Sequence, residues 1–187
     1  PVMISASCAD MSGRTLTGQT LRAFYEAVRH CKPVAFGLNC SLGALQMKPL
    51  VSEVASFAEC PVLCYPNAGL PDGIGGFAET PESMLVSMRE IMEKGGADIV
   101  GGCCGTTPEH IALLRREADR INAERSGYVQ RDSVRVNSCL VVSGLEEVEI
   151  DRARFNITNV GERTNVAGSR KFARLVAEGN YQAAIDF

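Results

Sequence analysis

The chain has 187 residues, of which 45% are apolar and 22% are charged, and its net charge is −3. This composition excludes a disordered or low-complexity protein, and the negative charge argues against a nucleic-acid partner, which a basic face would bind. No apolar run reaches 18 residues, and no basic leader precedes an apolar segment. We therefore expect no membrane span and no secretory signal, and we place the protein in the cytoplasm.

Eight cysteines are present, more than an ordinary cytoplasmic domain needs. A disulfide framework belongs to small secreted domains, whereas this chain has long helical patterns. Cys31, Cys60 and Cys64 lie in or beside apolar runs, where a free thiol packs as a small hydrophobe. For the cysteines that stand in loops we expect a role in metal binding or catalysis.

Strands and helices alternate over residues 1–122. Apolar runs at 2–5, 33–38, 61–65 and 99–100 predict strands, and apolar residues at helical spacing predict helices over 21–28, 45–57, 81–94 and from 108 onward. Thr80-Pro81 and Thr107-Pro108 open the last two helices, because threonine caps free N–H groups and proline fits the first helical position. Four such units predict a parallel sheet, either half of a (β/α)8 barrel or a small doubly wound sheet.

The sequence changes character after the fourth helix. Residues 123–154 are charged, with short β-like runs at 134–136 and 139–142, and predict an interdomain linker. A fresh strand is expected over 155–160, followed by a helix around Phe172, Leu175 and Val176. We therefore predict domains at 1–122 and 155–187, and we expect the chain to be a piece of a larger protein.

Polar residues follow each predicted strand, at the edge where parallel α/β folds bind their ligands. These residues are Asp10 after the first strand, Asn39 and Cys40 after the second, Asn67 after the third, and Cys103 and Cys104 after the fourth. We expect Cys40, Cys103, Cys104 and Asn67 to converge on one rim.

Three cysteines on one rim favour a catalytic zinc site. Such a site takes three protein ligands and leaves one position open, and thiolates are soft ligands that suit zinc. A metal-bound thiol is deprotonated, and the thiolate is the nucleophile. The predicted chemistry is attack by a zinc-bound substrate thiolate on an activated alkyl group. Glycines around the Cys103-Cys104 pair let the backbone bend, and the N–H groups near Thr106 and Thr107 can hold a substrate carboxylate.

Simpler interpretations stay open for the same residues. A Cys-Cys pair is often structural or incidental, a vicinal disulfide is strained, and a redox role would favour a CxxC spacing. Asn39 and Asn67 are common turn residues, and Asp10 is either a loop residue or a partner for a substrate ammonium group. His30 and His110 lie in or next to helices and are poor candidates for ligands.

Several motifs resemble known families. GLNC at 37–40, PNAG at 66–69 and GGCCGTTPEHI at 101–111 resemble the homocysteine-binding barrel of homocysteine methyltransferases. SGLE at 143–146 and FNITNVGERTNVAGS at 155–169 resemble the start of the folate-binding barrel in cobalamin-dependent methionine synthases. The resemblance implies a (β/α)8 TIM-barrel type of α/β fold, with the last four strand–helix units of one barrel and the first of a second.

The resemblance also implies a methyltransferase in methionine biosynthesis. Homocysteine, activated by zinc, would accept a methyl group from methylcobalamin, which 5-methyltetrahydrofolate remethylates; cobalamin would be held by a module outside this chain. The implied zinc ligands are Cys40, Cys103 and Cys104, with Asn67 as a fourth ligand in the absence of substrate. Implied homocysteine contacts are Asp10, Asn39 and Thr106, and implied folate contacts are Asn159, Glu162 and Asn165.

Two alternatives stand beside this interpretation. One is a cobalamin-independent homocysteine S-methyltransferase that uses betaine or S-methylmethionine, which would share the zinc motif but has a single barrel and leaves GERTN unexplained. The other is a non-catalytic zinc-binding fragment. Expected partners are homocysteine and the cobalamin-binding module, with no nucleic acid and no membrane. We do not expect the chain to be fully active alone.

Overall fold

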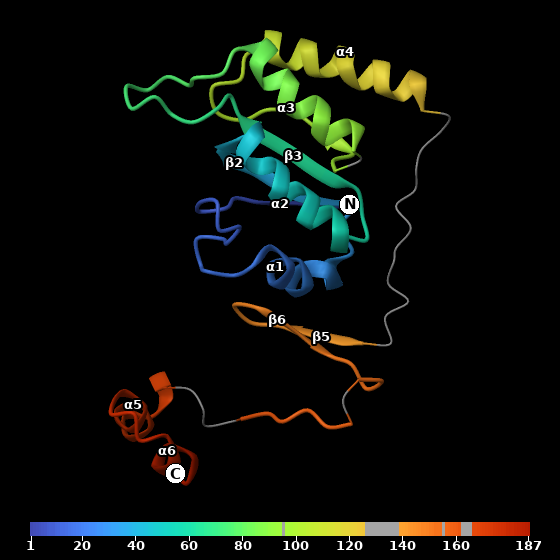
Figure 1. Ribbon diagram of the computed structural model, residues 1–187. Helices are drawn as coiled ribbons and strands as arrows, with labels where there is room; N and C mark the ends of the chain where they lie inside the picture. The colour runs from blue at the N-terminus through green and yellow to red at the C-terminus, as the bar shows by residue number, and fades with distance from the viewer. Residues whose placement is uncertain (95, 126–138, 155, 162–165) are drawn as a thin grey trace. The chain divides into compact units, whose positions relative to one another are not determined.

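The computed structural model describes residues 1–94, 96–125, 139–154, 156–161 and 166–187. These residues fall into two units, Pro1–Ile150 and Asp151–Phe187. Figure 1 shows the strands and helices of the first unit as a sheet covered by helices. The predicted domain boundaries at 122 and 154 stay a prediction.

A four-stranded parallel sheet lies at the centre of the first unit. Its strands are β1 (Met3–Ala6), β2 (Ala35–Gly43), β3 (Val62–Asn67) and β4 (Ile99–Val100), and they pair in their order along the chain. The prediction of four strands in a parallel sheet is confirmed, although β2 runs five residues past its predicted end at Leu38. The strand order does not reverse, as it would in a doubly wound sheet.

The helices form one layer against this sheet. They are α1 (Leu21–Val28), which continues into the 3-10 turn η1 (Arg29–Cys31), α2 (Ala44–Phe57), α3 (Pro81–Glu93) and α4 (Pro108–Glu124). Consecutive helices contact each other (Figure 1), as expected when right-handed crossovers join neighbouring parallel strands. In the described ranges, no helix is both long and apolar enough to cross a bilayer.

The hydrophobic core lies between the helices and the sheet. Buried side chains from β2, α2 and α3 fill it, among them Phe36, Leu38, Met47, Val51, Met84 and Met88. The ring of Tyr25 on α1 meets that of Phe36 edge-on, with centroids 5.0 Å apart. Full burial of each large apolar side chain stabilises the fold by about 1.5–3 kcal/mol. This packing fixes where the carboxyl ends of the strands lie.

A buried carboxylate joins α3 to α4. Arg89 on α3 donates to both oxygens of Glu117 on α4, at 2.7 and 3.2 Å, and Arg120 donates to the same carboxylate at 2.6 Å. These bonds, first that from Arg89 and then that from Arg120, lower the pKa of Glu117 to about 2. The helix that follows the Cys103-Cys104 pair is thereby held against its neighbour.

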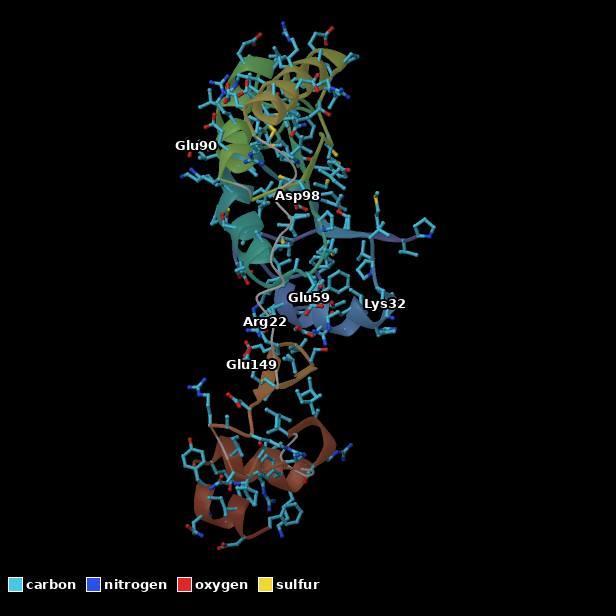
Figure 2. The ribbon with its side chains drawn as sticks, turned by 90° about the vertical axis from the view of Figure 1, so that its right-hand side faces the viewer. Arg22, Lys32, Glu59, Glu90, Asp98 and Glu149 are labelled. Carbon is cyan, nitrogen blue, oxygen red and sulfur yellow. The ribbon has the colours of Figure 1, made fainter. Side chains whose placement is uncertain are left out.

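An antiparallel hairpin, β5 (Leu140–Ser143) and β6 (Glu147–Ile150), packs on α1. The N-cap residue of α1, Thr20, donates from its backbone N–H to the carbonyl of Leu145 at 2.9 Å and from its hydroxyl to Glu147 at 2.8 Å. Arg22 forms an ion pair with Glu149, as Figure 2 shows. The predicted strand at 139–142 is confirmed within one residue, and the predicted run at 134–136 lies outside the described residues.

The second unit contains the turn η2 (Val166–Gly168) and the helices α5 (Arg170–Ala177) and α6 (Tyr181–Ile185). The helix predicted around Phe172 is confirmed. The strand predicted over 155–160 is absent from residues 156–160, where Ile157 and Val160 are 79% and 86% exposed. An isolated strand leaves its N–H and C=O groups unpaired, and in the described part no neighbouring strand pairs with this segment.

Candidate metal centre

The structure brings together the three cysteines that were predicted to be metal ligands. The Sγ atom of Cys104 lies 3.6 Å from that of Cys40 and 3.8 Å from that of Cys103. All three Sγ atoms lie within 4.8 Å of one another. Cys40 comes from β2 and the other two follow β4, so the ends of two strands build this three-cysteine cluster.

The geometry of the three-cysteine cluster fits a tetrahedral zinc ion. Zinc–sulfur bonds of about 2.3 Å at tetrahedral angles place two sulfurs about 3.8 Å apart. The separations of 3.6 and 3.8 Å already have this length, and the third pair, within 4.8 Å, needs only a small adjustment. Among the described residues the group contains three donors and no histidine or carboxylate. The donor set therefore suits a soft metal and leaves one coordination position for a further ligand.

An unusual backbone delivers Cys40 to the cluster. Cys40 and Ser41 have φ angles of 61° and 65°, in the left-handed region, which costs an L-residue about 1–2 kcal/mol. The pairing of β2 with β3 shifts register between Asn39 and Gly43 at the same place. Side chains hold this bend to β1: the hydroxyl of Ser7 lies 2.8 Å from that of Ser41. Strained backbone of this kind persists where the surroundings fix it, and it is common at functional sites.

The Cys103-Cys104 pair is held by β3 through backbone hydrogen bonds. The N–H of Cys103 donates to the carbonyl of Pro66 at 2.8 Å, and the N–H of Cys104 donates to Oδ1 of Asn67 at 3.1 Å. The N–H of Ala68 donates to the carbonyl of Cys104 at 2.9 Å. Both cysteines are therefore fixed by main-chain contacts, which leaves their thiols free to face Cys40.

The thiols of Cys40 and Cys104 influence each other's pKa. The backbone N–H of Ser41 is the largest cause that lowers the pKa of Cys40, and the thiols of Cys104 and Cys103 add to it. The same contacts, first that with Cys40, raise the pKa of Cys104 to about 11. The first proton leaves easily because neighbouring thiols donate to the thiolate, and the second must leave beside an existing negative charge. The cluster is thus suited to a cation that neutralises the further thiolates.

Three predicted substrate contacts have protein partners. Asp10 is exposed, and it accepts the N–H of Ser12 at 2.7 Å. The side chain of Ser12, and then this N–H, lower the pKa of the Asp10 carboxyl. Oδ1 of Asn39 accepts the hydroxyl of Ser5 at 2.6 Å. The hydroxyl of Thr106 donates to the carbonyl of Cys103 at 2.7 Å. Asn39 and Thr106 therefore lie in the framework of the cluster, and the role of all three toward substrate stays a prediction.

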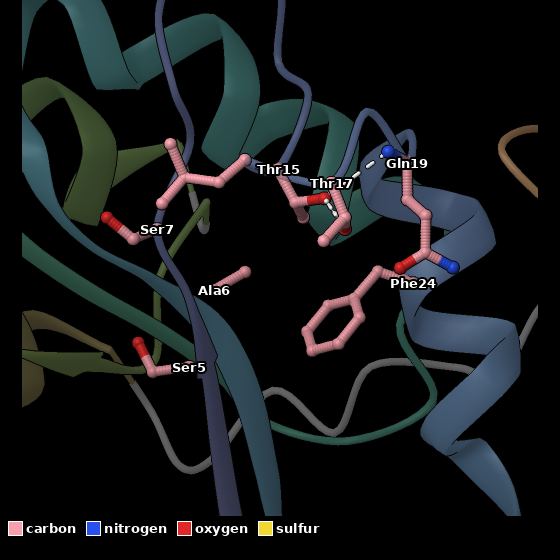
Figure 3. Close-up of a pocket in the computed structure, with 8 residues that line it drawn as sticks. Ser5, Ala6, Ser7, Thr15, Thr17, Gln19 and Phe24 are labelled. Atoms are coloured by element: carbon pink, nitrogen blue, oxygen red, sulfur yellow. Dashed lines mark hydrogen bonds between the residues drawn. The ribbon is translucent and has the colours of Figure 1, made fainter.

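A pocket of about 250 Å³ lies beside β1 (Figure 3). Its walls come from the end of β1, the loop before α1 and the ring of Phe24, and they include Ser5, Ser7, Thr15 and Gln19. The three cysteines are not among its lining residues. Ser5 and Ser7 nevertheless join this pocket to the cluster, because their hydroxyls contact Asn39 and Ser41 of β2.

The predicted folate contacts are not assembled in the described part of the chain. Asn159 is exposed and lies outside any helix or strand. Glu162 and Asn165 lie outside the described residues. Their role stays a prediction that rests on the sequence motif alone.

The structural role of one residue of this region, His110, was not predicted from the sequence. His110 is 4% exposed, and it bonds to Thr107 at the start of α4 and to Glu79 in the loop after β3. His110 is not part of the three-cysteine cluster, and its expected lack of a role as a metal ligand stays a prediction. The sequence contains a signal for this capping role, because His110 stands three residues after Thr107. From that position a side chain can reach back to the N-cap residue.

Comparison with known proteins places this arrangement in a family. The family model described as homocysteine S-methyltransferase matches residues 1–118, which include β1 to β4 and the three-cysteine cluster. A solved structure of the homocysteine methyltransferase MmuM from Escherichia coli, in its oxidised form, matches with 23% identity and a TM-score of 0.46. That match covers 58% of this chain and 33% of the MmuM chain, so it spans about a third of that protein. With most of its length matched by the family model, this chain belongs to the homocysteine S-methyltransferase family.

Proposed function

We propose that the chain binds homocysteine at a zinc ion held by Cys40, Cys103 and Cys104, as the methyl-accepting part of a methionine-forming methyltransferase. The observation that carries the proposal is the convergence of three thiols at the spacing of tetrahedral zinc. Membership of the homocysteine S-methyltransferase family supports the choice of substrate.

In this proposal, different residues of the chain have different roles in binding the metal and homocysteine. The three thiolates hold the metal, which when bound keeps a coordinated substrate thiol deprotonated near neutral pH. Asn67 and the backbone around Ala68 fix the Cys103-Cys104 pair. In the first turn of α4, Pro108 has no N–H and the N–H of His110 bonds to the side chain of Thr107. The N–H of Glu109 is therefore our candidate for the substrate carboxylate. Asp10 is our candidate for the substrate ammonium group.

We infer further that the full enzyme is a cobalamin-dependent methionine synthase. The GERTN segment after the SGLE motif supports this choice, because single-barrel homocysteine methyltransferases have no counterpart to it. The family model ends at residue 118, within α4, so it does not cover the SGLE and GERTN motifs. In this proposal methylcobalamin donates the methyl group, 5-methyltetrahydrofolate restores it, and the second unit begins the folate-binding barrel.

The (β/α)8 barrel is part of the same proposal. Two features support it: the strands pair in sequence order, and the helices form one layer. A singly wound sheet of this kind curls toward closure, whereas a doubly wound sheet carries helices on both faces. Four strands would then be half of the barrel, with its domain at 1–122 and a linker at 123–154.

The experiment that tests the metal site is zinc analysis of the full chain with X-ray absorption at the zinc edge, before and after homocysteine is added. We expect one zinc per chain with three sulfur neighbours, rising to four with homocysteine. Absence of zinc, or four sulfurs throughout, would contradict the open site. Methyl transfer from methylcobalamin, betaine and S-methylmethionine, assayed side by side, separates the cobalamin-dependent enzyme from the alternatives.

A further inference from the structure

His110 is built into the start of α4 through both nitrogens of its ring. Its Nδ1 atom accepts the backbone N–H of Thr107 at 3.1 Å. An imidazole nitrogen that accepts carries no proton, so this contact assigns the proton to Nε2. That second nitrogen lies 3.3 Å from the carbonyl oxygen of Glu79, to which it donates. With 4% exposure, His110 uses both ring nitrogens inside the protein.

The contact with Glu79 joins α4 to a loop that is distant in sequence. Glu79 stands at the end of the loop between β3 and α3, and its backbone N–H donates to the carbonyl of Ala68 at 2.9 Å. Ala68 in turn donates to the carbonyl of Cys104. The loop is therefore bonded to His110 at one end and to a cluster cysteine at the other.

These bonds form a closed ring. From Cys104 the ring runs through Ala68, Glu79 and His110 to Thr107, which lies three residues after Cys104 along the chain. Two of its hydrogen bonds join backbone groups, and the other two are made by the His110 side chain. Removal of that side chain opens the ring, and the turn that carries Cys103 and Cys104 then loses one of its links to the loop after β3.

We propose that His110 is a positioning residue for the Cys103-Cys104 pair, which acts by tying the loop after β3 to the first turn of α4. The inference rests on the proposed zinc site. Contacts that hold metal ligands in place are typically worth about 10- to 100-fold in metal affinity. We therefore expect loss of His110 to weaken zinc binding by about tenfold or more.

If His110 served only as a helix cap, it would still accept the N–H of Thr107. The test must therefore separate the effect of this bond from the effect of the bond to Glu79. Glutamate at this position restores the cap, because its carboxylate accepts the N–H of Thr107 and suits the helix N-terminus. It cannot donate to the carbonyl of Glu79. Glutamine offers an acceptor and a donor on one amide, so it can make both bonds.

The experiment measures zinc affinity of the full chain by competition with a chromophoric chelator, and the visible spectrum of bound Co²⁺ as a readout of ligand geometry. The variants are His110→Ala, His110→Glu and His110→Gln. Glu117→Gln, in the same helix, is the control for a general loss of stability. We expect affinity to fall in His110→Ala and His110→Glu, with an altered Co²⁺ spectrum, and to return to within about threefold of wild type in His110→Gln.

Three results would overturn the positioning role while the zinc site stands. They are unchanged affinity in His110→Ala, equal recovery in His110→Glu and His110→Gln, and an equal loss in Glu117→Gln. Wild-type protein that binds no zinc is a separate outcome, because it removes the proposed function and the inference with it. The wild-type measurement alone therefore tells the two failures apart.

Discussion

The backbone N–H of Cys104 donates a 3.1 Å hydrogen bond to Oδ1 of Asn67, whose side chain is almost fully buried. Asn67 is the last residue of β3, so this bond fastens a metal-ligand candidate to the sheet rather than to a loop. The same oxygen is the one predicted as a fourth zinc ligand. An amide oxygen has two lone pairs, and the bond to Cys104 uses one of them.

Asn67→Ala removes this bond and leaves the N–H of Cys104 without its partner. A typical hydrogen bond contributes about 0.5–1.5 kcal/mol, so we expect the free energy of unfolding to fall by that amount in urea titrations. If Asn67 is a ligand only in the absence of substrate, the variant retains zinc when homocysteine is bound. Loss of zinc from the homocysteine complex would show that Asn67 is instead a permanent ligand.

Cys104→Ser tests the ligand set. A serine hydroxyl is a poor zinc ligand beside two thiolates, and two thiolates do not complete the three-ligand site of a catalytic zinc. We expect zinc content to fall from about one per chain to a small fraction of that, measured by elemental analysis after dialysis. The matched control is Cys31→Ser, which changes an exposed cysteine outside the three-cysteine cluster. Stoichiometric zinc in Cys104→Ser would remove Cys104 from the ligand set.

Homocysteine binding to the zinc-loaded protein is expected to release about one proton per zinc near neutral pH, because a coordinating thiol is deprotonated. A free thiol has a pKa of about 8.5, so the release should fade as the pH rises above that value and the ligand arrives already as a thiolate. Calorimetry in buffers of different ionisation enthalpy measures the number of protons. Homoserine, which has a hydroxyl in place of the thiol, is the control ligand; equal release with both would rule out thiolate formation as the source.

The outline of the fold was predictable because local rules decide it. Apolar runs marked the four strands, and the Thr-Pro pairs marked the starts of α3 and α4. The meeting of Cys40 with Cys103 and Cys104 followed from a topological rule, since the carboxyl ends of parallel strands share an edge. To predict that these three cysteines meet, only their positions at the ends of strands were needed.

The details of the site depend on contacts between distant segments, which local rules do not contain. The left-handed backbone at Cys40 and Ser41 has no local signal such as glycine. The bond from Cys104 to Asn67 exists because β3 and the turn after β4 lie side by side. A strand was expected at 155–160 because its residues favour one. In the described part of the chain no neighbouring strand pairs with this segment, so the local preference is not sufficient.

Glu117→Gln is expected to weaken the link between α3 and α4 and to change acid stability. The ion pairs with Arg89 and Arg120 hold the folded-state pKa of Glu117 near 2, below the usual value of 4.5. A lowered pKa stabilises the fold above pH 4.5, and the contribution is lost as the pH falls from there toward 2. Glutamine keeps one acceptor but no charge, so we expect a loss of about 1–3 kcal/mol at pH 7.

The measurement is urea unfolding of wild type and Glu117→Gln between pH 7 and pH 3. The difference between them should shrink as the pH falls below 4.5, because Glu117 then takes up a proton in the unfolded wild-type chain but not in the folded one. The control is Asp119→Asn, which removes an exposed ion pair with Arg115 on the same helix and should cost less than about 1 kcal/mol. A difference that stays constant with pH would contradict an ionic origin.

Gly105 connects the cluster to the loop after β3 through close packing. Its φ is +76°, and a Cβ added there would lie 2.4 Å from the ring of Phe77. Gly73, in the same loop as Phe77, has a φ of +82° but nothing within 4 Å of an added Cβ. Alanine at either position carries the left-handed strain of about 1–2 kcal/mol, and alanine at Gly105 adds a clash that costs about 1–3 kcal/mol.

We therefore expect Gly105→Ala to lose more stability than Gly73→Ala in urea titrations. Because Phe77 must move aside in Gly105→Ala, the loop should also open, and limited proteolysis near residues 72–76 should be faster than in wild type or Gly73→Ala. Zinc affinity should fall with it, since the turn that carries Cys103 and Cys104 packs on that loop. Equal stability and equal cleavage in the two variants would mean that Phe77 can move away from Gly105 without a loss of stability. The packing of Phe77 on Gly105 would then not hold the loop against the cluster.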